Sequence, residues 1–220
     1  MQSPFRFGIL PQGILRVPIG QREAGPGLLG SRRHAAMHRG LRLGGGFDVH
    51  APVTSEYRRL AGMLDRSIPL YQVPGNHDLD AYAVPGGASV DGRVFRAAGL
   101  TVAGLGGSRR YKREGRHQYT EAEMRTRALW LGLRLVLRRL AGRGRLDLLV
   151  THAPARAIHD APDHTHRGFQ AFRGLLWAVR PRLMLHGHVH IAPNLDRRES
   201  ELYGVRILNV YPVLKVELQT

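Results

Sequence analysis

Much of the chain consists of short apolar runs that predict buried β-strands. One run lies near the N-terminus, at residues 5–10. The others lie at residues 68–73, 100–107, 146–152, 182–188, 204–211 and 213–218. Between some of these runs, residues 54–66, 120–140 and 168–179 carry apolar side chains at helical spacing. Strands that alternate with helices predict an α/β fold.

The longest predicted helix, at residues 120–140, opens with a capping box formed by Thr120 and Glu123. Its apolar stripe predicts the face that packs on the core. The stripe consists of Leu129, Leu133, Val136, Leu137 and Leu140. Because arginines are frequent in the same segment, a basic helix that lies on a membrane surface is the alternative interpretation.

Residues 11–46 do not follow this pattern. They contain nine glycines, six arginines and a single acidic residue, Glu23, and no strand or helix period persists. A structureless loop of this length is unusual in a compact domain. The segment is expected to be disordered or degenerate, through a slip of the reading frame or through loss of selection.

The composition is that of a globular protein. The 220 residues are 43% hydrophobic and 23% charged, which suits one domain with a substantial core. The chain has no run of 18 apolar residues, so neither a membrane span nor a membrane partner is expected. The N-terminus lacks a signal peptide's apolar segment, which makes a cytoplasmic location the default expectation. Cysteine is absent, which excludes disulfides and thiolate metal sites.

The formal net charge of +16 is a feature of nucleic-acid-binding proteins. Its basis here is unusual, since every basic residue except Lys112 and Lys215 is arginine and the chain has 27 glycines. A GC-rich coding sequence produces this skew, and the basic residues are scattered along the chain. We favour mutational bias, with an arginine-rich nucleic-acid surface as the alternative.

Three histidines, His186, His188 and His190, follow the apolar run at residues 183–185. Side chains alternate between the faces of a strand, so the three share one side if the extended geometry continues. Neutral imidazole is the commonest nitrogen ligand for first-row metals. The cluster therefore favours a metal site over a structural role.

Two further predicted strands end in residue types that bind metals. The sequence GNHD follows one strand at residues 75–78, and THAP lies at the end of another at residues 151–154. Open α/β sheets place ligands outside the carboxyl ends of their strands. Three such endings in one chain predict one shared site.

The sequences GNHD at 75–78, THAP at 151–154 and GHVH at 187–190 together resemble the last three of the five motifs of the calcineurin-like metallophosphoesterases. The resemblance covers about residues 47–220 and the first strand. It implies a four-layer α-β-β-α sandwich of two mixed sheets flanked by helices, formed by residues 1–220 as a single domain. It also implies two divalent metal ions, such as Mn, Fe or Zn, that bind a phosphate ester and activate a water molecule.

The resemblance also implies roles for individual residues. By position, Asn76, His152 and His188 are ligands of the second metal, and His190 is a ligand of the first. His77 corresponds to the family's catalytic histidine, which contacts the phosphate and assists the leaving group. An imidazole can donate a proton near neutral pH, in agreement with this role.

The chain departs from the family at the first motif. An Asp-x-His is expected near residue 12, where the chain has Gln12 and Ile14. Asp48 lies 28 residues before Asn76 and resembles the aspartate that bridges the two metals, although Phe47 replaces the usual glycine. Alternatively, the sequence DVH at 48–50 resembles the first motif itself. With Asp48 as the bridging ligand, we expect one tightly bound metal and reduced activity.

Two loops near the motifs have open interpretations. The basic sequence GGSRRYKREGRHQY at 106–119 is either a binding loop for phosphate or nucleotide, or a solvated loop. His164 and His166 are interpreted as surface residues, with the mouth of the substrate site as the alternative.

The leading expectation for function is a metal-dependent phosphoesterase that hydrolyses phosphomonoesters or phosphodiesters. The first alternative is a degenerate, non-catalytic member of the family that retains a metal site. The second is a nucleic-acid-binding protein that uses its arginines, for which a steep salt dependence of binding is diagnostic.

Overall fold

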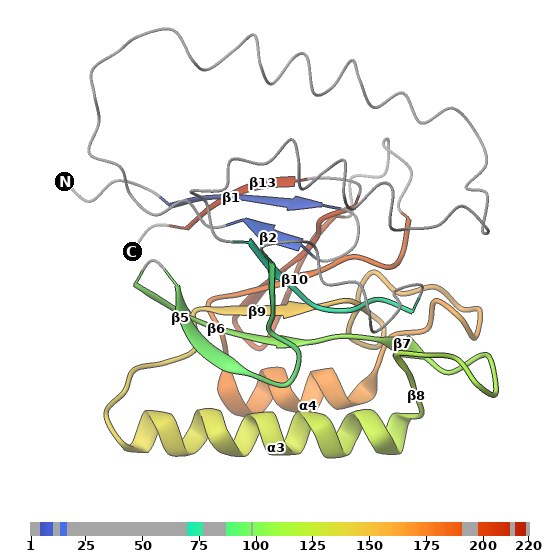
Figure 1. Ribbon diagram of the computed structural model, residues 1–220, viewed down its shortest axis with the longest axis horizontal. Coiled ribbons are helices and arrows are strands. Elements are labelled where there is room, and N and C mark those ends of the chain that lie inside the picture. The colour runs from blue at the N-terminus through green and yellow to red at the C-terminus, as the bar shows by residue number, and fades with distance from the viewer. Residues whose placement is uncertain are drawn as a thin grey trace, which may run out of the picture.

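The described part of the chain forms two stacked β-sheets, a small two-stranded sheet and a layer of helices (Figure 1). The computed structural model describes residues 5–10, 14–16, 70–76, 87–97, 99–190, 198–211 and 214–218. Of the predicted elements, the helix at residues 54–66 lies outside these ranges. The arrangement is the mixed α/β fold that the sequence predicts.

The first sheet has five strands in the order β13-β1-β2-β3-β4. They are β13 (Leu214–Leu218), β1 (Phe5–Leu10), β2 (Ile14–Arg16), β3 (Leu70–Gln72) and β4 (Gly87–Ser89). Strand β1 runs antiparallel to both β13 and β2, and β3 runs parallel to β4. The sheet is therefore mixed.

The second sheet has six strands in the order β11-β12-β10-β9-β6-β5. They are β11 (Glu199–Leu202), β12 (Val205–Asn209), β10 (Leu183–His186), β9 (Leu148–Thr151), β6 (Leu100–Leu105) and β5 (Val94–Ala97). The four central strands are parallel, whereas β5 and β11 form antiparallel edges. Strands β7 (Ser108–Arg109) and β8 (Gln118–Tyr119) pair separately.

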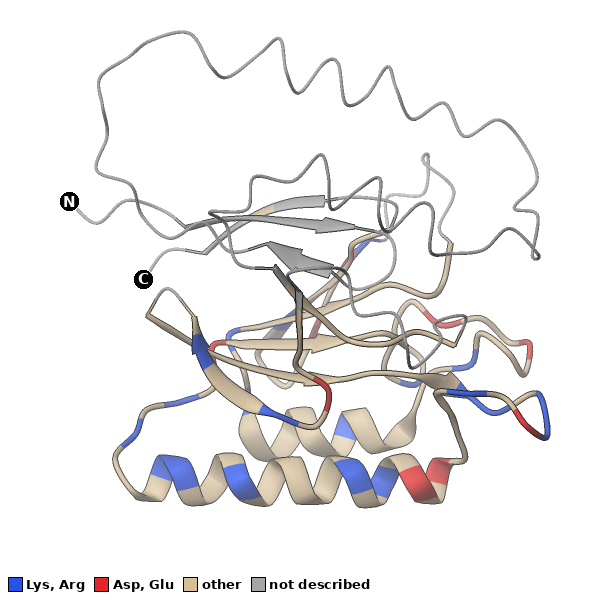
Figure 2. Ribbon diagram, viewed as in Figure 1, with Lys and Arg blue, Asp and Glu red and all other residues tan. Residues whose placement is uncertain are grey.

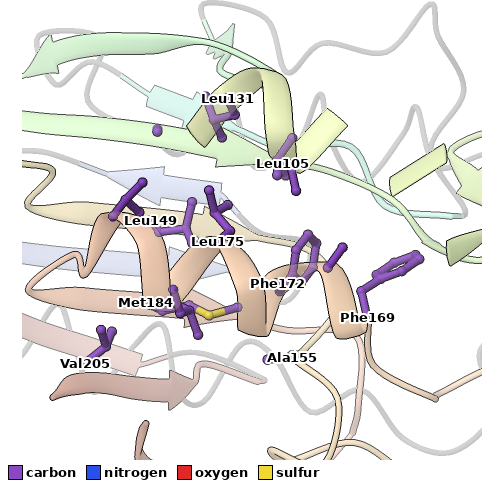
Figure 3. Close-up of a cluster of buried hydrophobic side chains, with 14 of the residues drawn as sticks. Leu105, Leu131, Leu149, Ala155, Phe169, Phe172, Leu175, Met184 and Val205 are labelled. Atoms are coloured by element: carbon purple, nitrogen blue, oxygen red, sulfur yellow. The ribbon is translucent and has the colours of Figure 1, made fainter. Parts of the chain in front are cut away.

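Helices α3 (Glu121–Leu140) and α4 (Gln170–Val179) cover one face of the second sheet (Figure 1). Side chains of the central strands alternate between two apolar cores. Leu149 and Met184 pack towards the helices, against Leu175 and Phe172 (Figure 3). Their neighbours along the strands, such as Leu148, lie in the core that includes residues of β3 and β13. The second sheet is thus buried on both faces, as its continuous apolar runs predict.

The N-termini of the two helices are linked. Thr120 and Glu123 form the capping box of α3 that the sequence predicts. Helix α4 has no side-chain cap of its own. Glu121 of α3 takes that role, since its carboxylate accepts from the backbone N–H of Ala171 at 2.7 Å and from that of Gln170 at 3.2 Å. A carboxylate in this position satisfies unpaired donors at the start of the helix.

The predicted core-facing stripe of α3 is wrong. Leu129 is 67% exposed and Leu140 is 78% exposed, and the other members of the stripe are exposed as well. The buried side instead consists of Met124, Ala128, Leu131, Gly132 and Leu135. Gly132 allows a close approach of α4, because a Cβ there would lie 3.3 Å from the Leu175 side chain. With apolar residues on both sides of the helix, spacing alone does not identify the side that is buried.

The predicted strands that fall within the described ranges are confirmed, most of them with shorter bounds than predicted. The edge strands β4, β5 and β11 and the short strands β2, β7 and β8 were not predicted, since their residues are partly polar or too few to show a period. Within the described ranges, no helix is long and apolar enough to cross a membrane.

Candidate metal site

Neighbouring parallel strands bring two of the predicted site residues together. Strands β9 and β10 are paired with Thr151 opposite His186, so His152 and His188 both follow the carboxyl ends of these strands. Asn76 follows β3 of the other sheet. The site therefore lies where the two sheets meet, at the edge that the sequence predicts for a ligand.

The three side chains converge on one atom. The Nε2 atom of His152 lies 3.0 Å from Oδ1 of Asn76 and 3.1 Å from Nδ1 of His188. All three residues are buried. Buried polar side chains are paired in native structures, and here Oδ1 of Asn76 and Nδ1 of His188 are both paired with Nε2 of His152.

Surrounding hydrogen bonds fix which atoms face the centre. Asn76 donates from Nδ2 to the hydroxyl oxygen of Tyr111 at 2.9 Å, which turns its Oδ1 towards His152. The Nε2 atom of His188 lies 3.0 Å from the carbonyl oxygen of Thr165, so this nitrogen carries the proton and donates it. The Nδ1 atom of His188 is then an acceptor. Two lone pairs thus point at the same ring nitrogen of His152.

These distances suit a metal ion. Two ligands at right angles, each about 2.1–2.2 Å from an ion, lie about 3.0–3.1 Å apart. The separations of 3.0 Å and 3.1 Å around His152 Nε2 have this value. The hydrogen bond from His188 to a carbonyl oxygen is also the usual outer contact of a metal-binding histidine. The residues present therefore fit a divalent ion held by one amide oxygen and two imidazoles.

Only two residues of the cluster, His152 and His188, belong to the types that most often bind metals in proteins. Within the described ranges, no three His, Cys, Asp or Glu side chains gather closely enough to hold a metal ion. Asn76 supplies the third donor here, and an amide oxygen is a weaker, neutral ligand. Two of the other predicted site residues, Asp48 and His77, lie outside the described residues.

The backbone is adapted to the cluster at two positions. His188 has a φ of +64°, and the hydrogen bond from Val189 N to Gly187 O, 2.7 Å long, closes a γ-turn around it. Such a conformation is unfavourable for a residue with a Cβ and is found mainly at functional sites. At Gly75, a Cβ would lie only 2.6 Å from Cε1 of His152. Because Gly75 has no side chain, the space beside it is open to the imidazole of His152.

The three histidines at the end of β10 and after it do not share one side, because the γ-turn ends the extended geometry. His188 joins the cluster, whereas His186 points elsewhere and pairs with His159, with 2.9 Å between Nε2 of His186 and Nδ1 of His159. His190 is exposed, and its ring stacks on Tyr211 with 3.9 Å between centroids. Its predicted role at the first metal stays a prediction.

The buried His186 and the half-buried His159 form a polar chain beside the site. Nδ1 of His186 donates to the carbonyl oxygen of Gly187 at 3.1 Å, so its Nε2 accepts from His159. The Ser200 hydroxyl then donates to Nε2 of His159 at 2.8 Å. Burial lowers the pKa of His186 to about 3 and also lowers the pKa of His159. Both imidazoles are therefore neutral near pH 7.

The sequence favoured a surface position for His164 and His166, with the mouth of the substrate site as the alternative, and the loop that carries them borders the site. Thr165 accepts from His188, and the ring of His166 lies 5.2 Å from the ring of His188, centroid to centroid. His166 is half-buried and pairs through Nδ1 with Asp163 at 2.9 Å. His164 is exposed, and its Nε2 donates to the carbonyl oxygen of Arg110 at 2.8 Å. The run of histidines in this loop was the sequence signal that could have assigned it to the site.

The basic loop at residues 106–119 reaches the same edge. Tyr111 touches the cluster through Asn76, a contact that sequence reasoning missed. Arg109 and Arg110 pair with acidic residues at the start of α3, at 2.8 Å and 2.9 Å. These two arginines help to anchor the loop. The exposed basic residues at its tip are Lys112, Arg113 and Arg116.

The sequence profile of the calcineurin-like phosphoesterases matches residues 37–192, which is more than half of the chain. The chain therefore belongs to the calcineurin-like phosphoesterase family. The matched range includes the three motifs described above and also Asp48.

A solved structure shares the fold at low sequence identity. One crystal structure is 13% identical with a TM-score of 0.51, over 74% of this chain and 66% of its own. The chain thus spans about two thirds of that relative. The crystal structure of TT1561 of Thermus thermophilus is 15% identical with a TM-score of 0.48, over 74% of this chain and 72% of its own. Comparison with curated proteins gave no significant match.

Proposed function

We propose that the protein is a metal-dependent phosphoesterase that hydrolyses phosphomonoesters or phosphodiesters. The observation that carries the proposal is the convergence of Asn76 Oδ1 and His188 Nδ1 on His152 Nε2, at distances that suit ligands of one ion. Asp48 completes this set as the anionic ligand. A divalent ion bound there supplies positive charge that polarises the phosphate and acidifies water.

The residues of the chain then have distinct tasks. Tyr111 and Thr165 hold Asn76 and His188 in the orientation that presents their lone pairs. His77 donates a proton to the leaving oxygen of the substrate, where general acid catalysis contributes about 10²–10⁴-fold. His166 contacts a phosphate oxygen in this proposal, which is supported by its half-buried position beside the His188 ring.

The test combines metal content with turnover. Purified protein, loaded with Mn²⁺, is expected to hydrolyse bis(4-nitrophenyl) phosphate or 4-nitrophenyl phosphate. His188→Ala should lower both metal content and turnover, whereas His164→Ala, an exposed histidine that contacts only backbone, should retain its metal. Equal metal content in the two variants would contradict the assignment of His188.

A second candidate is a metal-binding family member with little or no catalysis. It is supported by Gln12 and Ile14, which stand where the family has the Asp-x-His of its first metal. Metal uptake by the wild-type protein without hydrolysis of either substrate would favour this candidate. Metal-stimulated hydrolysis that His77→Ala abolishes would exclude it.

A further inference from the structure

Helices α3 and α4 expose large apolar side chains on the side that faces away from the second sheet. The outer helical face, as we define it, consists of Leu129, Trp130, Leu133, Leu137 and Leu140 of α3 and Trp177 of α4. Each of these side chains is at least 48% exposed. Isolated exposed leucines are ordinary, but a contiguous apolar surface of this kind marks an interaction site.

Helical spacing places these residues together. Leu129, Leu133 and Leu137 are four residues apart, so they form one row along α3, and Leu140 continues it. Trp177 follows the buried Leu176 and precedes the buried Val179, so it lies on the side of α4 opposite the core. Both tryptophans of the chain thus belong to the outer helical face.

Arginines border the apolar row on both sides. At 3.6 residues per turn, Arg125 and Arg139 lie along one flank, and Arg134 and Arg138 lie along the other. No acidic residue occurs from Met124 to Leu146. Figure 2 shows the basic bands along α3 and in the loop that follows it, with acidic residues only at the start of the helix.

The two acidic residues at that start do not neutralise the row. Glu121 is bound to Arg109, and Glu123 is bound to Arg110. The row therefore combines exposed leucines and a tryptophan with arginines that form no ion pair with an acidic residue of the described ranges. Its complement is a surface that is both apolar and anionic.

The charge distribution argues against a second copy of the chain as the occupant. Pairing of two outer helical faces would bring two sets of arginines together, in a protein with a formal net charge of +16. Helix α3, which carries the leucine row, is also an outermost element of the arrangement (Figure 1). A lipid bilayer accepts exposed apolar side chains between its headgroups, and anionic headgroups attract arginines. Tryptophan is favoured at such an interface.

We propose that the outer helical face docks the protein peripherally on bilayers that contain anionic lipids. Leu129, Leu133 and Leu137 enter the headgroup region, the flanking arginines contact lipid phosphates, and Trp130 and Trp177 lie at the boundary. The proposal is independent of the catalytic activity, because it uses none of the residues of the metal site.

The test is flotation of the full chain with vesicles, together with its tryptophan fluorescence. Vesicles of equimolar phosphatidylcholine and phosphatidylglycerol should bind the protein and shift its emission to shorter wavelength. Pure phosphatidylcholine should not bind it, and added salt should weaken the binding. Leu133→Ser combined with Leu137→Ser should lower the partition coefficient at least about tenfold. Both positions are exposed, so the fold should persist, and circular dichroism checks this.

Matched variants separate the face from general effects. Arg125→Gln with Arg139→Gln should weaken vesicle binding several-fold. Lys112→Gln with Arg113→Gln removes the same charge from an exposed loop and should weaken it far less. Tyr203→Ser removes an exposed aromatic ring from the β11–β12 turn and should leave binding unchanged.

Three outcomes would overturn the proposal. If the wild-type protein is a monomer and does not bind anionic vesicles, the outer helical face would instead be a binding surface for a protein partner. A dimer that Leu133→Ser with Leu137→Ser converts to monomer, without vesicle binding, would identify a self-association surface. If the helix variant and the loop variant lose vesicle binding equally, the binding would depend on net charge alone and not on the outer helical face.

Discussion

Asn76 and Tyr111, 35 positions apart in the sequence, are joined by a hydrogen bond of 2.9 Å from the amide Nδ2 to the phenolic oxygen. With the amide nitrogen at Tyr111, Oδ1 is the atom of the Asn76 side chain that faces His152, at 3.0 Å from Nε2. An amide can bind a metal only through its oxygen. The orientation of the Asn76 side chain therefore determines whether the cluster offers a metal ion two ligand atoms or three.

Tyr111→Phe should weaken metal binding without unfolding the protein. Loss of the hydroxyl frees the Asn76 amide to rotate, and loss of an outer contact of this kind typically costs about 10–100-fold in metal affinity. Calorimetric titration with Zn²⁺ or Mn²⁺ measures the change. Tyr203→Phe, in an exposed turn, is the matched control, and an equal affinity in both variants would contradict the role of Tyr111.

Gly75→Ala should displace the His152 ring, since the new methyl group would lie 2.6 Å from Cε1 in the present arrangement. We expect weaker metal binding than in the wild type. Gly174→Ala is the matched control, because a Cβ there meets nothing within 4 Å and alanine favours the helix by up to about 1 kcal/mol. Titration and thermal unfolding of both variants test the expectation. Unchanged metal affinity in Gly75→Ala would mean that the ring tolerates the shift.

His77→Ala should retain its metal and lose turnover, by about 10²–10⁴-fold if the residue is a general acid. The loss should be greater with phenyl phosphate than with 4-nitrophenyl phosphate, since nitrophenolate leaves readily without a proton. Metal content and kcat with both substrates are the measurements. A uniform loss on both substrates would argue for a binding role instead.

Metal titration of the purified protein should reveal about one tight site per chain. In the proposed function, the tight site would consist of Asp48, Asn76, His152 and His188. The first site would retain only Asp48 and His190, because Gln12 and Ile14 stand where the family has its other ligands, and two protein ligands hold a divalent ion weakly. Two equivalent tight sites would show that another segment, such as residues 48–50, supplies the missing ligands.

Acid should destabilise the fold through His186. Burial lowers its pKa from 6.5 to about 3, so the folded state holds the neutral imidazole. The contribution to stability is present above pH 6.5 and decreases as the pH falls towards 3, by roughly 3–5 kcal/mol in total. Urea unfolding at a series of pH values measures this slope. His186→Gln should flatten it, and an identical slope in the variant would assign the effect to other groups.

The sequence predicted the central strands and the three strand endings because each has a strong local signal. The apolar runs of β9 and β10 can only be buried strands in this context, and the carboxyl ends of parallel strands meet at one edge. That is enough to bring His152 and His188 together without knowledge of the rest of the fold.

Other features depend on tertiary contacts that have no local signature. The orientation of α3 is decided by Gly132 against Leu175, which a helical period does not reveal. The separation of His186 from His188 depends on a γ-turn, in which a histidine adopts a positive φ. Tyr111 reaches Asn76 only because the loop at residues 106–119 folds back over the site.

The carboxylate of Glu121 has a consequence for how the molecule opens. It belongs to the first turn of α3 and accepts from the backbone of Ala171, 50 positions later, while Arg109 binds it from the β7 strand. The start of α4 therefore cannot fray independently, because release of its amides requires rupture of contacts with two other elements. Local opening of this region is a single cooperative event, and hydrogen exchange at Gln170 and Ala171 should follow that event rather than simple end fraying. The loop at residues 159–168 carries Thr165 and leads directly into α4. The contacts of Glu121 at the start of α4 therefore also restrain one end of this loop.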